Sequence, residues 1–128
     1  MNLGLIFHEL GDCQKAMDSY KKATAINPNF SAAHNNFGLV LEKLKKHQKA
    51  IKYYKTAIQN NPKFFVAINN LGLTYHNMGD LKNAQSYYER AIEINPKFTH
   101  AICNLGNIKK ELNNFEEAIK YYKLALSF

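Results

Sequence analysis

The sequence predicts an all-α fold, a right-handed α-solenoid (a superhelix) in which antiparallel helix hairpins pack side by side. The first observation is a strict period of 34 residues, which Pro28, Pro62 and Pro96 keep. The second is that four further registers recur at the same step without an insertion: Gly4, Gly38, Gly72 and Gly106; Ala16, Ala50, Ala84 and Ala118; Tyr20, Tyr54, Tyr88 and Tyr122; Ala23, Ala57, Ala91 and Ala125. A period of this length is typical of helical repeat arrays, whose units pack only on their neighbours.

The period divides one continuous array into four units, residues 1–30, 31–64, 65–98 and 99–128. The unit over residues 65–98 is the cleanest copy. The first unit lacks the residues that would begin its first helix, so we expect the chain to be a fragment of a longer array.

Each unit predicts two helices joined by a short turn, and the first three units end at Asn-Pro, which a helix cannot continue. The expected turns are Gly11-Asp12, Lys45-Lys46, Gly79-Asp80 and Asn113-Asn114. In the first unit, a turn at Gly11-Asp12 predicts a separate second helix from about Cys13 to Ile26. In the second unit, the sequence predicts helices over about 31–44 and 48–59. Ser31 and Thr99 are expected as N-caps.

Small residues in the repeat predict close packing of the two helices of a hairpin. Gly72 is expected to face Ala84, and a large side chain in its place would overpack the hairpin. Lys109 departs from this scheme, because it occupies the register of Leu41 and Tyr75, where a core residue is expected. Its aliphatic stem could still be buried with the ammonium group in water.

The net charge of +7 belongs mainly to one unit. Residues 31–64 carry seven lysines and the single acid Glu42, which gives +6, whereas the other units are near neutral. This basic patch, Lys43, Lys45, Lys46, Lys49, Lys52 and Lys55, could contact nucleic acid. However, no arginine or aromatic platform interleaves with it, so we favour a solvated face.

Composition excludes several classes of protein. No stretch approaches the ~20 apolar residues of a membrane helix, and the first residues lack the features of a signal peptide. Cys13 and Cys103 are too few for a disulfide framework or a zinc site, so we expect reduced thiols and a cytoplasmic location. His8 and His76 share a register but lie two units apart, which argues against a metal site. The sequence predicts no catalytic residues and no cofactor.

The pattern NNLGLTY…GD…A…YY..AI.INP resembles the tetratricopeptide repeat, and the match covers essentially the whole chain. The early tryptophan of that family is replaced by His34, Ile68 and Ile102. In such arrays the first helix of each hairpin lines a concave groove. The resemblance therefore implies these groove positions: Asn35, Asn36, Leu39, Val66, Asn69, Asn70, Leu73, His100, Asn104 and Asn107.

One asparagine recurs in a single register, at Asn2, Asn36, Asn70 and Asn104. A side-chain amide offers both a donor and an acceptor, so stacked amides could hold the backbone of an extended peptide. This resembles the asparagine ladder of protein O-GlcNAc transferases. Alternatively, these amides satisfy neighbouring backbone groups or water. Recognition of a terminal carboxylate is disfavoured, because the groove registers next to the asparagines lack the lysine or arginine that such a clamp needs.

We therefore expect a non-catalytic scaffold that binds a protein or peptide. Asn36, Asn70 and Asn104 would hold the peptide backbone, and Leu39, Val66 and Leu73 would supply apolar contacts. Two alternatives stay open. The array could be the substrate-recognition arm of a larger glycosyltransferase-like enzyme, or it could form a homo-oligomer through an uncapped C-terminal hairpin.

Overall fold

The structure is a computed structural model that describes the backbone of residues 3–128 and the side chains from Gly11 onward. The predicted Asn2 of the ladder register and His8 thus have no described side chain. The described residues contain seven helices and no strand: α1 (Leu3–Ile26), α2 (Ser31–Lys43), α3 (His47–Asn60), α4 (Phe65–Asn77), α5 (Leu81–Ile94), α6 (Thr99–Glu111) and α7 (Phe115–Leu126). The chain forms two compact units, Met1–Asn61 and Pro62–Phe128.

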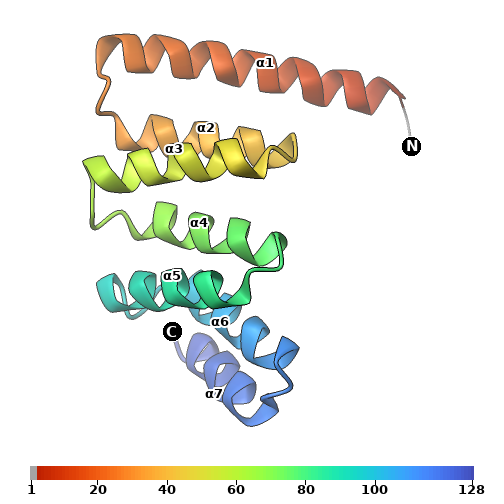
Figure 1. Cartoon of the computed structure of the whole chain (residues 1–128), viewed down its shortest axis with the longest axis vertical. Coiled ribbons are helices and arrows are strands. Elements are labelled where there is room, and N and C mark those ends of the chain that lie inside the picture. The colour runs from red at the N-terminus through yellow and green to blue at the C-terminus, as the bar shows by residue number, and fades with distance from the viewer. Residues whose placement is uncertain (1–2) are drawn as a thin grey trace. The chain divides into compact units, whose positions relative to one another are not determined.

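Helix α1 corrects the prediction for the first unit. It runs without a break from Leu3 to Ile26, so Gly11 does not form a turn (Figure 1). Glycine adopts helical and left-handed angles with similar ease, so the residue itself permits either outcome. A turn therefore requires contacts between the residues on the two sides of Gly11, and in the continuous α1 these residues lie along a single helix.

In the first unit, α2 and α3 form an antiparallel hairpin, and α1 packs against α2 (Figure 1). Tyr20 of α1 stacks on Phe37 of α2, with ring centroids 4.3 Å apart and planes 10° apart. Tyr53 of α3 meets both rings edge-on. The buried His34 bridges the Tyr20 hydroxyl, at 3.0 Å, and the Pro28 carbonyl oxygen, at 2.8 Å. Aromatic contacts thus join all three helices of this unit.

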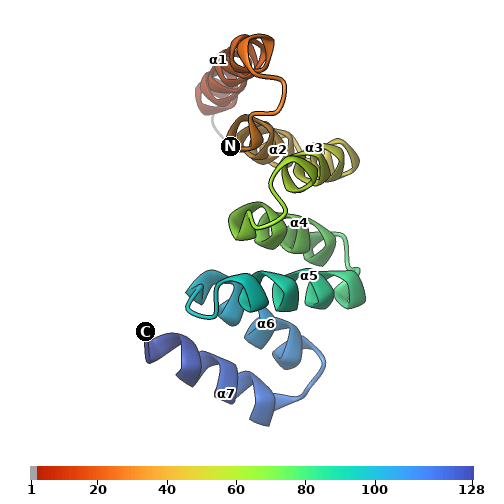
Figure 2. The same cartoon turned by 90° about the vertical axis from the view of Figure 1, so that its left-hand side faces the viewer.

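The second unit consists of two hairpins, α4–α5 and α6–α7, with α6 packed against α5 (Figure 2). A buried cluster joins Ala84 and Tyr88 of α5 to Leu105 and Ile108 of α6, and Tyr75 of α4 packs against it. The atoms nearest to a Cβ atom added at Gly72 would be those of the Tyr88 ring on α5, at 2.9 Å. The expected close approach of the two helices is therefore present.

The predicted turns outside α1 are confirmed. Lys45, Gly79 and Asn113 hold the same place in successive hairpins, with φ of 58°, 85° and 62°. Glycine adopts such angles readily, whereas a lysine is strained there.

Two predicted N-caps are wrong. Ser31 and Thr99 are the first helical residues, and Phe30 and Phe98 precede them without a side-chain cap. Side-chain caps occur instead at the α5 and α7 turns, where Asp80 accepts a hydrogen bond from the Asn83 backbone amide and Asn114 accepts one from that of Glu117. In these turns a short polar side chain falls in the N-cap position itself, as the capping rule requires.

Lys109, which occupies a core register of the repeat, forms an ion pair. Its side chain is largely buried, and the ammonium nitrogen lies 3.3 Å from a carboxylate oxygen of Glu117. Helix α7 also exposes several large apolar residues: Phe115 (56% exposed), Ile119 (52%), Leu124 (42%) and Leu126 (86%).

Candidate functional site

The candidate site in the first unit lies on helix α2. Asn36 is exposed, and Leu39 follows three residues later with 41% of its surface exposed. Residues three apart in a helix share a face. The Asn36 side chain makes no hydrogen bond with any other described residue.

The same pattern recurs on α4 and α6 in the second unit. Asn70 is half-buried, and Leu73 three residues later is 39% exposed. Val66, one turn earlier on α4, is half-buried. On α6, Asn104 is half-buried, whereas His100 and Asn107 are exposed. Every ladder asparagine that the structure describes thus keeps some contact with solvent.

Asn35 and Asn69 are buried, with 4% and 5% of their surface exposed. Their predicted place in the groove is therefore corrected, because residues one position apart on a helix face different directions. With so little surface, these two amides contribute to packing between helices rather than to contact with a peptide.

Asn104 and Asn69 are hydrogen-bonded to each other. The Asn104 side-chain nitrogen donates to the Asn69 side-chain oxygen over 3.1 Å, which connects α6 to α4. A carboxamide has two N–H donors and one oxygen acceptor, so Asn104 keeps one donor and its acceptor for another partner. These two groups are enough to pair with one peptide unit of a bound chain.

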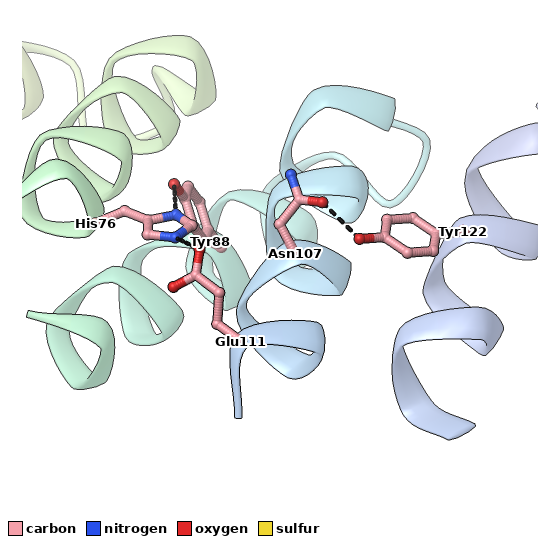
Figure 3. Close-up of polar contacts among 5 residues, drawn as sticks. All are labelled: His76, Tyr88, Asn107, Glu111 and Tyr122. Carbon is pink, nitrogen blue, oxygen red and sulfur yellow. Dashed lines mark hydrogen bonds and ion pairs between the residues drawn. The ribbon is translucent and has the colours of Figure 1, made fainter. Parts of the chain in front are cut away.

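A second polar cluster in this unit was not predicted from the sequence (Figure 3). The His76 Nε2 atom lies 2.7 Å from Glu111, and its Nδ1 atom lies 3.3 Å from the Tyr88 hydroxyl. Beside it, the Tyr122 hydroxyl donates to the Asn107 side-chain oxygen over 2.5 Å. His76 therefore joins α4, α5 and α6, a role that only the tertiary packing could disclose.

Burial raises the pKa of the Tyr88 hydroxyl well above its usual 10.0, and the Glu111 carboxylate adds to the rise. The equivalent residue of the first unit, Tyr54, behaves alike, since burial and then Glu42 raise the pKa of its hydroxyl. Glu42 also pairs with His47 over 2.9 Å. Both buried tyrosines therefore stay protonated through the physiological range.

All six lysines of the basic patch are exposed. The side chains of Lys43, Lys45, Lys46, Lys49, Lys52 and Lys55 form no ion pair with any residue between 11 and 128. Lys49, Lys52 and Lys55 lie on α3, three residues apart, which gives that helix a cationic stripe.

Other chemical sites are sparse in the described part of the chain. Cys13 is buried and Cys103 half-buried, and neither forms a disulfide. Among the side chains that the structure describes, histidine, cysteine and acidic residues do not gather in groups of three or more that could hold a metal ion. None of the described helices combines the length and the apolar character needed to span a membrane.

Tandem antiparallel hairpins with a fixed period define a helical repeat protein. The chain belongs to the tetratricopeptide repeat family. Models of the tetratricopeptide repeat match residues 31–64, 65–98 and 99–128, and a TPR repeat model matches residues 4–45. The predicted α-solenoid class is thereby confirmed.

Solved structures of MamA proteins are similar to this chain. A crystal structure of MamA is 30% identical, with a TM-score of 0.82 over 98% of this chain and 73% of that chain. A second MamA crystal structure is also 30% identical, with a TM-score of 0.79 over 98% of this chain and 68% of that one. MamA from Desulfovibrio magneticus RS-1 is 22% identical over 98% and 71%, and its TM-score of 0.78 shows a shared fold. No curated protein matched the sequence.

Proposed function

We propose that the chain is a non-catalytic scaffold that binds an extended peptide through Asn36, Asn70 and Asn104. The observation that carries this proposal is the placement of all three amides in one helical register with access to solvent. Helix packing accounts for part of this recurrence, because Asn104 bonds to Asn69. A ligand with a repeating backbone would also account for the asparagine at the exposed position 36.

The proposed contacts divide between backbone and side chains of the peptide. Each amide would pair with one peptide unit, donating to its carbonyl oxygen and accepting from its N–H group. Leu39 and Leu73 lie beside the amides with about two fifths of their surface exposed, so they would contact apolar peptide side chains. His100 and Asn107 would supply polar contacts from α6.

The bound peptide could come from a separate protein or from the substrate of a larger enzyme. In the second case the array would be a recognition arm, with catalysis in another domain. The same amides would serve in both cases, so the first test concerns the amides themselves.

The test replaces Asn36, Asn70 and Asn104 together by alanine. Peptides of about 12 residues, long enough to extend past several turns of helix, are first selected from a random display library against the unaltered chain. The triple variant is expected to bind them at least about 10-fold more weakly, since each lost hydrogen bond contributes about 0.5–1.5 kcal/mol. Equal affinity in both proteins would refute the ladder.

A matched control uses three exposed asparagines outside the register: Asn29, Asn60 and Asn77. Their replacement by alanine removes the same chemical groups and should leave peptide affinity unchanged. Circular dichroism then verifies that both triple variants keep their helix content.

Self-association is a second candidate, which the exposed apolar residues of α7 favour. Phe115, Ile119 and Leu126 each expose more than half of their surface. Single exposed apolar residues are common, but several on one helix often mark an interface. If α7 pairs with another copy, sedimentation should show a mass that rises with concentration, and Ile119→Lys should abolish the rise.

A further inference from the structure

We propose that a cleft between α1 and α2 receives one uncharged aromatic side chain of the bound peptide, next to Asn36. This inference rests on the proposed function, because it takes the peptide backbone to be held by Asn36. It adds a side-chain preference, which amides that bind backbone alone cannot provide.

The cleft has a volume of about 320 Å³. Ala16 and Ala23 of α1 and Ala33 of α2 contribute only methyl groups to its wall, and Tyr20 and Phe37 supply aromatic surface. Asn36 lies on its lining, so a backbone held by that amide passes the mouth of the cleft. An apolar cavity of about 150 Å³ accommodates benzene, so this cleft is large enough for an aromatic side chain.

The chemistry of the lining selects an uncharged occupant. None of the described residues that line the cleft is charged, and the Tyr20 hydroxyl is already bonded to His34. A charged side chain would lose its hydration there without gaining an ionic partner, which is unfavourable. A ring gains apolar contact and can also meet the stacked rings of Tyr20 and Phe37 edge-on.

The repeat provides an internal comparison two periods later. Ala16, Tyr20, Phe37 and Val40 correspond to Ala84, Tyr88, Leu105 and Ile108, which form the buried cluster of the second unit. There the partly buried side chains that pack against the cluster include the aromatic ring of Tyr75, together with Leu81, Ile92 and Tyr121. In the first unit, Ala16, Tyr20 and Val40 all keep accessible surface. The same kind of surface that accepts a tyrosine ring in one unit is thus open in the other.

Ser19 explains part of the open space. It occupies the register that holds Tyr53, Tyr87 and Tyr121 in the other units, and it lines the cleft. Tyr87 stacks on Tyr75, with centroids 5.6 Å apart and planes 5° apart. A serine in this register removes one ring from the wall, so the place of that ring is available to a ligand.

The test measures peptide binding by nuclear magnetic resonance on the whole ¹⁵N-labelled chain. The probes are capped, uncharged serine and threonine peptides of about 12 residues that differ only at a central phenylalanine, alanine or glutamate. The phenylalanine peptide is expected to bind about 10- to 100-fold more tightly than the alanine peptide, from the burial of one ring. The glutamate peptide should bind no better than the alanine peptide.

Ser19→Tyr should remove the preference for phenylalanine and leave the affinity for the alanine peptide unchanged. Lys22→Tyr is the matched control, because it adds the same ring at another exposed position of α1 that does not line the cleft. Phe30→Ala, which removes one wall at an exposed position, should weaken only the phenylalanine peptide. Agreement of these variants supports the proposal even if one of them folds poorly.

The possible outcomes distinguish the proposed cleft from the proposed binding of the peptide backbone by the asparagines. If the peptides bind and Asn36→Ala weakens them, but phenylalanine and alanine peptides bind equally, the cleft is refuted and the ladder survives. If no peptide binds, both are refuted. If Ser19→Tyr instead changes the sedimenting mass, or raises the melting temperature without affecting peptides, a second copy or the chain's own segment fills the cleft and the inference is wrong.

Discussion

The side-chain nitrogen of Asn104 lies 3.1 Å from the side-chain oxygen of Asn69, one repeat earlier. The adjacent asparagines of the NN pair thus have different roles: Asn69 is buried between helices, and Asn104 retains contact with solvent. Part of the recurrence of asparagine is therefore explained by helix packing. The exposed Asn36 has no such partner among the described residues, and packing does not account for its place in the register.

The Asn69–Asn104 bond should stabilise the second unit measurably. Asn69→Ala is expected to lower the free energy of unfolding by about 0.5–1.5 kcal/mol, because it removes the hydrogen bond between the buried Asn69 and the half-buried Asn104. A double-mutant cycle with Asn104→Ala should give a coupling energy of about 0.5–1.5 kcal/mol in urea titrations. The control cycle pairs Asn69 with the exposed Asn77 and should give a value near zero. A coupling of zero in both cycles would mean that the bond does not form in solution.

Two glycines should respond in opposite ways to alanine. Gly72→Ala would place a Cβ atom 2.9 Å from the Tyr88 ring, so this substitution should destabilise the protein by about 1–3 kcal/mol. Gly11 lies inside α1 with no neighbouring heavy atom within 4 Å of the added Cβ. Gly11→Ala should therefore stabilise the protein by up to about 1 kcal/mol. Thermal melts of the two variants provide the comparison. A destabilised Gly11→Ala would indicate a turn at this position and contradict the continuous helix.

The turn at Lys45 should be improved by glycine. Lys45 adopts φ of 58°, where a Cβ atom is unfavourable, whereas Gly79 occupies the same register in the next hairpin. We expect Lys45→Gly to raise the free energy of unfolding by about 0.5–1 kcal/mol despite the greater freedom of the unfolded chain. Lys46→Gly, one residue later, removes the same charge without relieving this strain. Equal effects of the two substitutions would show that charge, not the backbone angle, determines the change.

Alkaline pH should destabilise the fold through the buried tyrosines. Burial, with a contribution from Glu42 or Glu111, raises the pKa of Tyr54 and Tyr88 above the usual 10.0. The native state therefore retains protons that the unfolded state releases, and stability falls as pH rises above about 10. Below about pH 10 both tyrosines are protonated in the native and the unfolded state, so they do not make stability depend on pH. Unfolding measured between neutral pH and about pH 11 should show this loss, and the double variant Tyr54→Phe, Tyr88→Phe should lose less. An identical pH dependence in the variant would refute the assignment.

Much of the fold can be predicted from the period, because proline recurs where a helix must end, and glycine and alanine recur where two helices pack closely. The bounds of α2 and α3 agree with the prediction to within one or two residues. The break at Gly11 was wrong because a glycine permits a turn without requiring one, and the packing that requires it is not local. The burial of Asn35 and Asn69 was missed for a related reason: the motif marks both asparagines, and only the helix packing separates them.

The side-chain amide signals of Asn36, Asn70 and Asn104 offer the most direct measurement of the central claim. Each carboxamide gives its own pair of N–H resonances, which shift when its hydrogen bonds change. With a bound peptide selected as above, all three pairs should shift and saturate together, while those of Asn29, Asn60 and Asn77 stay in place. A saturating peptide that leaves the three ladder amides unshifted would contradict the account.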